Sequence, residues 1–141
     1  MPFSVSLVVS VAIQVLCQIF KVVFNSLKER RFRPHYFVST GGMPSAHTAF
    51  VSALTVSLGL RHGLSSELFA VSFVFSAIVV YDLVRVRGAV HAHSAILARL
   101  LETLPPGERP ALPHLVGHSL LEILVGLAAG GGAAAAACLL F

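Results

Sequence analysis

Four apolar segments separated by polar stretches follow one another along the chain. They run from Phe3 to about Phe24, from Pro44 to Leu60, from near Ser66 to about Gly88, and from His114–His118 to Phe141. A helix needs roughly 20 mainly apolar residues to cross a bilayer. The pattern therefore predicts an all-α integral membrane bundle of about four spans, with residues 1–141 forming one domain.

Polar residues in the first segment recur at helical spacing. They are Ser10, Gln14, Gln18, Lys21 and Asn25. Steps of three and four residues place them on one face of a helix, which we expect to look into the bundle. For Lys21 alone, the alternative is that its ammonium snorkels from the end of the span to the lipid headgroups.

Small residues on two other segments predict close helix packing. The second segment carries Ser45, Thr48, Ser52 and Thr55, again at steps of three and four. The last segment carries Gly126 and Gly130 in a G-x-x-x-G pattern. Small side chains let helix backbones approach closely in membranes. We expect the glycine face to mediate self-association into a homo-oligomer.

The third segment begins with a helix start signal and is followed by a more polar stretch. Ser65 is a plausible N-cap, and Glu67 suits the first turn of the helix. Residues 89–104 are too short and too polar to cross a bilayer. They predict a separate amphipathic helix at the membrane interface.

Composition and charge agree with a membrane location and suggest an orientation. The chain is 56% hydrophobic and 11% charged, with a mean hydropathy of +0.86, which excludes an ordinary soluble domain. Nine basic residues fall on one side of the four-span arrangement: Lys21, Lys28, Arg30, Arg31, Arg33, Arg85, Arg87, Arg99 and Arg109. Only Arg61 falls on the other, so the positive-inside rule places both termini outside the cytosol. We expect an inner or plasma membrane protein that binds no nucleic acid.

The stretch "STGGMPSAHTAF", residues 39–50, carries candidate chemistry at the start of the second span. Pro44 is expected at the first helical position, after the side-chain-free approach of Gly41 and Gly42. The N–H groups of a first helical turn form an anion site, to which Ser45 adds a hydroxyl and His47 a proton. The alternative is a glycine-proline turn that only ends one helix and starts the next.

Three motifs in order resemble the type 2 phosphatidic acid phosphatase superfamily. "GGMPSAHTAF" is similar to its second signature, P-S-G-H, in the form found in a small divergent branch related to acid phosphatases and vanadium haloperoxidases. "YDLVRVRG" and "GHSLLEILVG" resemble later motifs of that branch. The superfamily's signature lysine and one signature arginine have no counterpart at the usual spacing. Lys21 and Arg87 are their best replacements, because each lies at the cytosolic end of a predicted span.

The resemblance implies a membrane lipid phosphate phosphatase that uses no metal or other cofactor. It gives His118 as nucleophile, Glu122 as the carboxylate that orients it, and His47 as general acid. Residues four apart on a helix are neighbours, so Glu122 can hold one ring nitrogen of His118. Gly41, Gly42 and Ser45 join Lys21 and Arg87 as implied phosphate-binding residues, with Asp82 and Gln18 as structural or site support. The expected substrate is phosphatidic acid, phosphatidylglycerophosphate or a polyprenyl phosphate.

Other interpretations remain open from the residues alone. His114, His118 and Glu122 follow at four-residue steps and could present a metal-binding face. Asp82 could pair structurally with Arg85 or Arg87 at a helix end. The main rival to an enzyme is a non-catalytic membrane scaffold or anionic-lipid-binding protein that retains the phosphatase fold.

Overall fold

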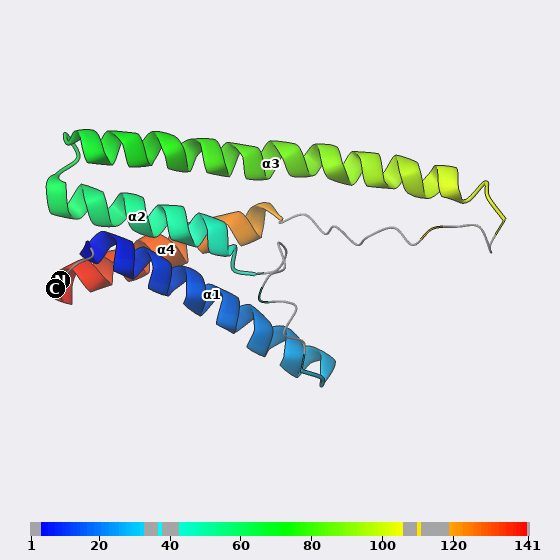
Figure 1. Cartoon of the computed structure of the whole chain (residues 1–141), viewed down its shortest axis with the longest axis horizontal. Helices are drawn as coiled ribbons and strands as arrows, with labels where there is room; N and C mark the ends of the chain where they lie inside the picture. Colours follow the sequence, from blue (N-terminus) through cyan, green and yellow to red (C-terminus); the bar gives the residue numbers. More distant parts are fainter. Residues whose placement is uncertain (1–3, 33–36, 38–42, 106–109, 111–118, 141) are drawn as a thin grey trace.

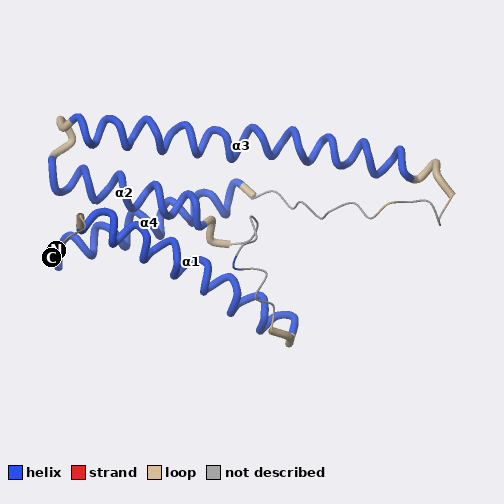
Figure 2. Tube along the Cα trace, viewed as in Figure 1, coloured by secondary structure: helices blue, strands red, loops and turns tan. Residues whose placement is uncertain are grey.

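The described part of the chain is helical and forms one bundle. The computed structural model describes residues 4–32, 37, 43–105, 110 and 119–140, with Arg87 described by its backbone alone. The helices are α1 (Val5–Glu29), α2 (Ala46–His62), α3 (Glu67–Leu101) and α4 (Leu120–Leu140), and these residues contain no strand. α2 is central and packs against α1, α3 and α4 (Figures 1 and 2). The predicted all-α fold is confirmed.

Three of the described helices are suited to crossing a membrane. By length and composition these are α1, α3 and α4. α2 has 17 residues, which is at the lower limit of the range for a transmembrane helix. Large apolar side chains cover the outward surfaces, such as Leu16, Val71 and Phe73, with exposed fractions of 63%, 69% and 57%. Such surfaces are stable against lipid rather than water, so the chain is a membrane protein.

Local sequence signals explain several helix ends. Ser4 caps α1 by accepting a hydrogen bond from the Leu7 N–H at 3.2 Å. Arg30 ends α1 in the left-handed conformation, with φ of 51°. Ser66 caps α3 by accepting from the Phe69 N–H at 3.2 Å, and Glu67 lies in the first turn as predicted. The N-cap is thus Ser66 and not Ser65, one residue later than expected.

The separate interfacial helix predicted for residues 89–104 is not present. Residues up to Leu101 instead continue α3 without a break. A single glycine, Gly88, costs a helix only about 1 kcal/mol relative to alanine, and no proline interrupts the sequence between residues 67 and 101. The 35 residues of α3 span about 52 Å, well beyond the roughly 30 Å of a hydrocarbon core. The C-terminal part of α3 projects past the other helices in Figure 1.

The polar stripe of α1 faces the bundle interior, as predicted. Ser10 and Lys21 are 0% and 1% exposed, and Gln14, Gln18 and Asn25 are partly buried. Lys21 therefore does not snorkel toward the headgroups. Ser10 donates to the carbonyl of Ser6 at 2.7 Å, and the side-chain amide of Asn25 donates to the carbonyl of Lys21 at 2.8 Å. These bonds satisfy polar groups that lipid could not.

α2 and α4 run parallel and share a close seam. Thr48 and Ser52 of α2 donate to the carbonyls of Ile123 and Leu127 at 3.3 and 2.8 Å. A Cβ placed on Gly130 would lie 2.6 Å from the Cα of Ala49, and both glycines of the G-x-x-x-G pattern are buried. The glycine face expected to mediate self-association is therefore occupied by α2 of the same chain.

Candidate functional site

The N-termini of α2 and α4 lie side by side. The N–H of Ser45 donates to the carbonyl of Glu122 at 3.2 Å, at the first turn of α4. α2 begins at Ala46 with Ser45 as N-cap, so Pro44 precedes the cap and does not occupy the first helical position as predicted. The first N–H groups of each helix lack intrahelical acceptors, and each helix dipole is positive at this end. Two parallel helices thus direct positive partial charge to one place.

Ser45 holds a buried hydroxyl at this junction. Its side chain is 0% exposed and makes no capping bond to its own helix. Its Oγ has no hydrogen-bond partner among the described residues. A buried hydroxyl without a partner costs free energy, and it could donate a hydrogen bond to an anion bound beside it. The candidate phosphate-binding role of Ser45 is consistent with this position.

Glu122 has a structural role that the sequence analysis missed. Its carboxylate Oε2 accepts from the N–H of Ser119 at 3.1 Å, and its own N–H donates to the Ser119 hydroxyl at 3.3 Å. This reciprocal pair is a capping box, and its S-x-x-E signal is readable at residues 119–122. α4 consequently begins at Leu120, later than the predicted start at His114–His118. The carboxylate is held at the start of α4, while the backbone carbonyl of Glu122 accepts from the Ser45 N–H.

Lys21 brings a buried cation to the same end of the bundle. Cys17 packs in one core cluster with Ala46 and Ala49 of α2, and Lys21 lies one turn further along the same face of α1. Gln18 is partly buried beside it, and its Oε1 has no hydrogen-bond partner within the described ranges. The buried ammonium thus lies at the same end as the two helix N-termini and the capping carboxylate of Glu122. Cationic side chains and helix N-termini are groups that bind anions.

α3, which also packs on α2, extends to the depth of the α2 N-terminus. Thr55 of α2 hydrogen-bonds Ser76 of the antiparallel α3 at 2.7 Å. Ten residues back along α2 is Ser45, and ten residues on along α3 is Val86. The Asp82–Arg87 stretch therefore lies at the depth of the α2 N-terminus, as the four-span arrangement predicted. The Asp82 side chain itself is exposed.

Several predicted site residues lie outside the described residues. They are Gly41, Gly42, His114 and His118, and the side chain of Arg87. His47 is described, and its exposed side chain lies on the first turn of α2. Among the described residues, no group of three His, Cys, Asp or Glu side chains could hold a metal ion. The proposed metal face would require His114 and His118.

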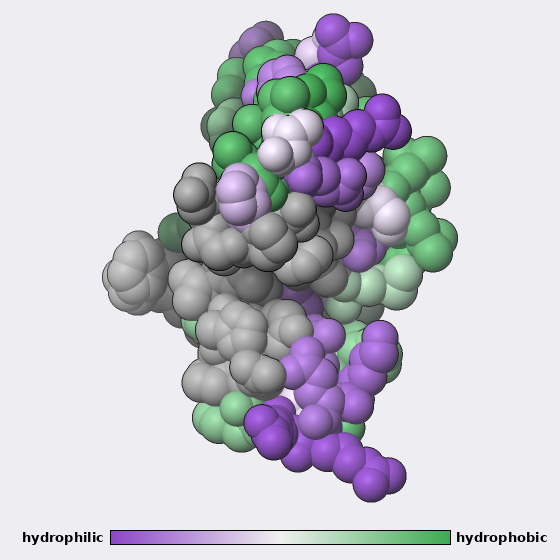
Figure 3. All heavy atoms as spheres, turned by 90° about the vertical axis from the view of Figure 1, so that its right-hand side faces the viewer, coloured by the Kyte–Doolittle hydropathy of each residue, from purple (hydrophilic) through white to green (hydrophobic). Residues whose placement is uncertain are grey.

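Hydrophilic residues gather at the end of the molecule where α2 and α4 begin. Figure 3 views this end, to which the exposed Lys28 in the last turn of α1 and the exposed Arg30 and Arg31 just after α1 belong. Arg61, at the C-terminal end of α2, lies at the opposite end (Figure 1). Basic residues on one end and a single arginine on the other reproduce the charge asymmetry expected from the sequence. The candidate site therefore lies at the basic end.

Comparison with known proteins agrees with the motif resemblance. Residues 4–133 match the family model described as the divergent PAP2 family. The chain is 30% identical over 135 residues to YuiD, an uncharacterized membrane protein of Bacillus subtilis (strain 168), covering 86% of this chain and 85% of that protein. No solved structure gives a significant match. With a family match over nearly its whole length and a membrane-protein relative, the chain belongs to the divergent PAP2 family.

Proposed function

We propose that the chain is a membrane lipid phosphate phosphatase that hydrolyses a phosphomonoester through a phosphohistidine intermediate. The substrate class is phosphatidic acid, phosphatidylglycerophosphate or a polyprenyl phosphate. Family membership supports a phosphatase-related membrane protein. The reaction, the intermediate and the residue roles are our proposal.

One observation favours a phosphate-binding site over a purely structural role for this end of the bundle. Two parallel helix N-termini meet at the Ser45–Glu122 hydrogen bond, and the nearly fully buried Lys21 packs at the same end. A buried ammonium beside two helix N-termini is an arrangement that favours a bound anion. A phosphate monoester is the anion that the family points to.

In the proposed reaction, one ring nitrogen of His118 attacks phosphorus and the bond from phosphorus to the lipid oxygen breaks. His47 donates a proton to that leaving oxygen, which releases the lipid alcohol. Water then attacks the phosphohistidine, the phosphorus–nitrogen bond breaks, and inorganic phosphate leaves while His47 takes back a proton. Glu122 orients His118, and the phosphate oxygens are bound by Lys21, Ser45, Arg87, Gly41 and Gly42.

The test is phosphate release from labelled phosphatidic acid or phosphatidylglycerophosphate by detergent-purified full-length protein. Wild-type protein should release phosphate, and brief reaction should trap acid-labile label on the protein. His118→Ala should lose both the label and turnover. Because the proposed nucleophile is an imidazole and not metal-bound water, excess chelator should leave the rate unchanged.

The controls distinguish a metal-independent phosphatase from a metal-dependent enzyme and from a non-catalytic scaffold. His91→Ala alters an exposed histidine on α3 and should retain full activity. Activity that is lost in chelator and restored by zinc or magnesium would favour the metal interpretation. Failure to release phosphate from every lipid of the class, by protein that still binds anionic vesicles, would favour the scaffold. Turnover that persists in His118→Ala would remove His118 as nucleophile.

A further inference from the structure

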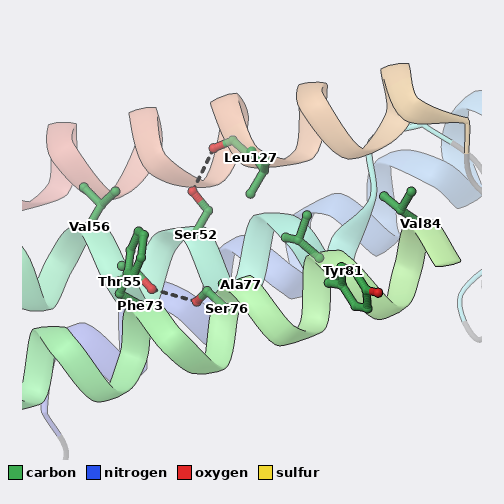
Figure 4. A pocket seen from close by; sticks show the side chains of 10 residues that line it. Ser52, Thr55, Val56, Phe73, Ser76, Ala77, Tyr81, Val84 and Leu127 are labelled. Atoms are coloured by element: carbon green, nitrogen blue, oxygen red, sulfur yellow. Dashed lines mark hydrogen bonds between the residues drawn. The ribbon is translucent and has the colours of Figure 1, made fainter.

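A groove runs along the bundle between α2, α3 and α4. It has a volume of about 550 Å³, and its walls include Phe73, Ala77 and Val84 of α3 and Leu127 of α4 (Figure 4). α3 packs mainly on α2, so its apolar face remains separated from α4 along this length. The groove lies in the apolar part of α3, which is a candidate membrane span.

The polar side chains in this groove are already bonded within the bundle. Ser52 donates to the Leu127 carbonyl at 2.8 Å, and Thr55 bonds Ser76 at 2.7 Å (Figure 4). Ser76 also donates to the carbonyl of Val51 at 3.2 Å. With these hydroxyls satisfied, the groove offers an apolar surface. A polar ligand would lose hydrogen bonds to water on entering the groove and would not replace them, whereas a hydrocarbon chain has no hydrogen bonds to lose.

The length of the groove suits a hydrocarbon chain from one leaflet. From Phe73 to Val84 along α3 is about 16 Å, close to half of the roughly 30 Å hydrocarbon core. A lipid chain that lies along this part of α3 would therefore start at the membrane surface and end near the bilayer centre.

The two ends of the groove differ chemically. At the Val84 end, the guanidinium of Arg85 lies over the ring of Tyr81, with its Cζ 5.8 Å from the centroid. This end is nearer to the α2 and α4 N-termini: Glu122 precedes the lining residue Leu127 by five positions, about 7.5 Å along α4. Tyrosine and arginine side chains suit the headgroup level of a membrane. An anionic head placed here would lie near the candidate phosphate site.

We propose that this groove holds one hydrocarbon chain of a phosphorylated membrane lipid, with the phosphate at the Tyr81–Arg85 end. The identity of that lipid as the substrate rests on the proposed phosphatase function. The lipid would enter sideways from the leaflet at the basic end of the bundle. Its chain along α2 and α3 would bring the phosphate toward Ser45 and Glu122 without leaving the membrane.

The test is photolabelling by phosphatidic acid that carries a diazirine in the middle of one acyl chain. The full-length protein is reconstituted in phosphatidylcholine nanodiscs, and the labelled residues are mapped by mass spectrometry. Label should concentrate on the groove walls, between Phe73 and Val80 and near Leu127. Ala77→Trp, which fills the middle of the groove, should lower this label by roughly tenfold, equivalent to about 1.4 kcal/mol of binding free energy.

Ile78→Trp is the matched control, because Ile78 is the next residue, is 54% exposed and does not line the groove. It should leave groove labelling unchanged, and circular dichroism should show the same helicity for both variants. Label spread evenly over the outward face of α3, or an equal loss in both variants, would overturn the proposal. So would a disulfide-linked dimer formed by Ala77→Cys in a background without Cys17 and Cys138, because a second copy would then occupy the groove.

A second probe tests the placement of the head. Diacylglycerol with the same photoreactive chain lacks the phosphate and should label the groove less than phosphatidic acid does. Equal labelling would overturn the assignment of the phosphate to the Tyr81–Arg85 end. Labelling does not require turnover, so the two proposals can fail separately. A labelled groove in protein that releases no phosphate would support the hydrocarbon-binding groove and contradict the phosphatase function. Phosphate release without groove labelling would support the phosphatase function and contradict the groove as the binding site of the lipid chain.

Discussion

At the scale of single residues, Lys21 and Glu122 make the candidate site testable. Lys21 carries a charged side chain into the bundle, where it is buried. Glu122 combines a helix-capping role with a proposed catalytic one. For each residue, one substitution changes the charge and keeps the shape, so structural and chemical roles can be measured separately.

Lys21→Met should weaken phosphate binding while preserving the fold. A hydrogen bond to a charged group is worth about 1.5–3 kcal/mol, so we expect the vanadate inhibition constant to rise by roughly ten- to a hundredfold. Circular dichroism in detergent should show the helicity of the wild type, because methionine fills similar space with a flexible, unbranched side chain. Lys28→Met changes an exposed lysine on the same helix and is the control. Unchanged vanadate inhibition in Lys21→Met would remove Lys21 from the site.

Glu122→Gln separates the charge of the carboxylate from its capping bond. Glutamine can also complete a capping box with Ser119, so stability should be nearly that of the wild type. The rate of the chemical step should fall by at least about tenfold, because an amide stabilises a charged imidazole less well. Glu122→Ala should lose the cap as well and cost about 1 kcal/mol of stability. Full activity in Glu122→Gln would leave Glu122 with a capping role only.

At the scale of helices, the seam between α2 and α4 determines where the site forms. Small residues let the two backbones approach, and the Ser45 N–H then reaches the Glu122 carbonyl at 3.2 Å. The two N-termini meet because the helices are parallel and in this register. Disturbing the seam should therefore affect both stability and the site.

Gly130→Ala and Gly132→Ala form a matched pair on α4. A Cβ at Gly130 would press against the Ala49 backbone, whereas a Cβ at Gly132 would meet no atom within 4 Å. Overpacking costs about 1–3 kcal/mol, so Gly130→Ala should lower the free energy of unfolding by that amount. Gly132→Ala should leave it unchanged or raise it. Denaturation in detergent–SDS mixtures, followed by circular dichroism, measures the difference, and equal stability of the two variants would contradict the seam.

The sequence predicted helix faces better than helix partners. Spacing of three and four residues identified the inward stripe that includes Ser10 and Lys21, because periodicity is a local property. It could not reveal that Gly126 and Gly130 meet α2 of the same chain, since a small-residue face does not specify its partner. The sequence pattern also predicted the end of α3 wrongly. The polar residues after Gly88 favour water over lipid around the helix, but they do not end the helix.

The same limit applies to the candidate site. Motif spacing pointed to Ser45, His47 and Glu122, and the structure brings Ser45 against the first turn of α4. The contact depends on a parallel packing of segments 75 residues apart, which no local pattern encodes. The capping box was readable from S-x-x-E at residues 119–122, but the predicted start of the span was placed earlier, at His114–His118.

At the scale of the whole molecule, one end of the bundle carries the N-termini of α2 and α4 together with most of the basic residues. The positive-inside rule predicts that this end faces the cytosol. In a background without Cys17 and Cys138, Arg31→Cys should react with a membrane-impermeant maleimide only after cells are opened. Ser65→Cys, in the turn between α2 and α3, should react in intact cells. The opposite labelling pattern would invert the orientation and move the proposed site to the other face.

The hydroxyl groups of α2 have a consequence for how the protein is made. Thr48 and Ser52 donate to carbonyls of α4, whose residues are synthesised 75 positions later. Until α4 has been synthesised, α2 is a short, hydroxyl-rich helix that lacks these interhelical acceptors. We therefore expect α2 to complete its insertion only together with α4. Any nascent chain that stops before residue 120 should leave α2 accessible to quality-control proteases.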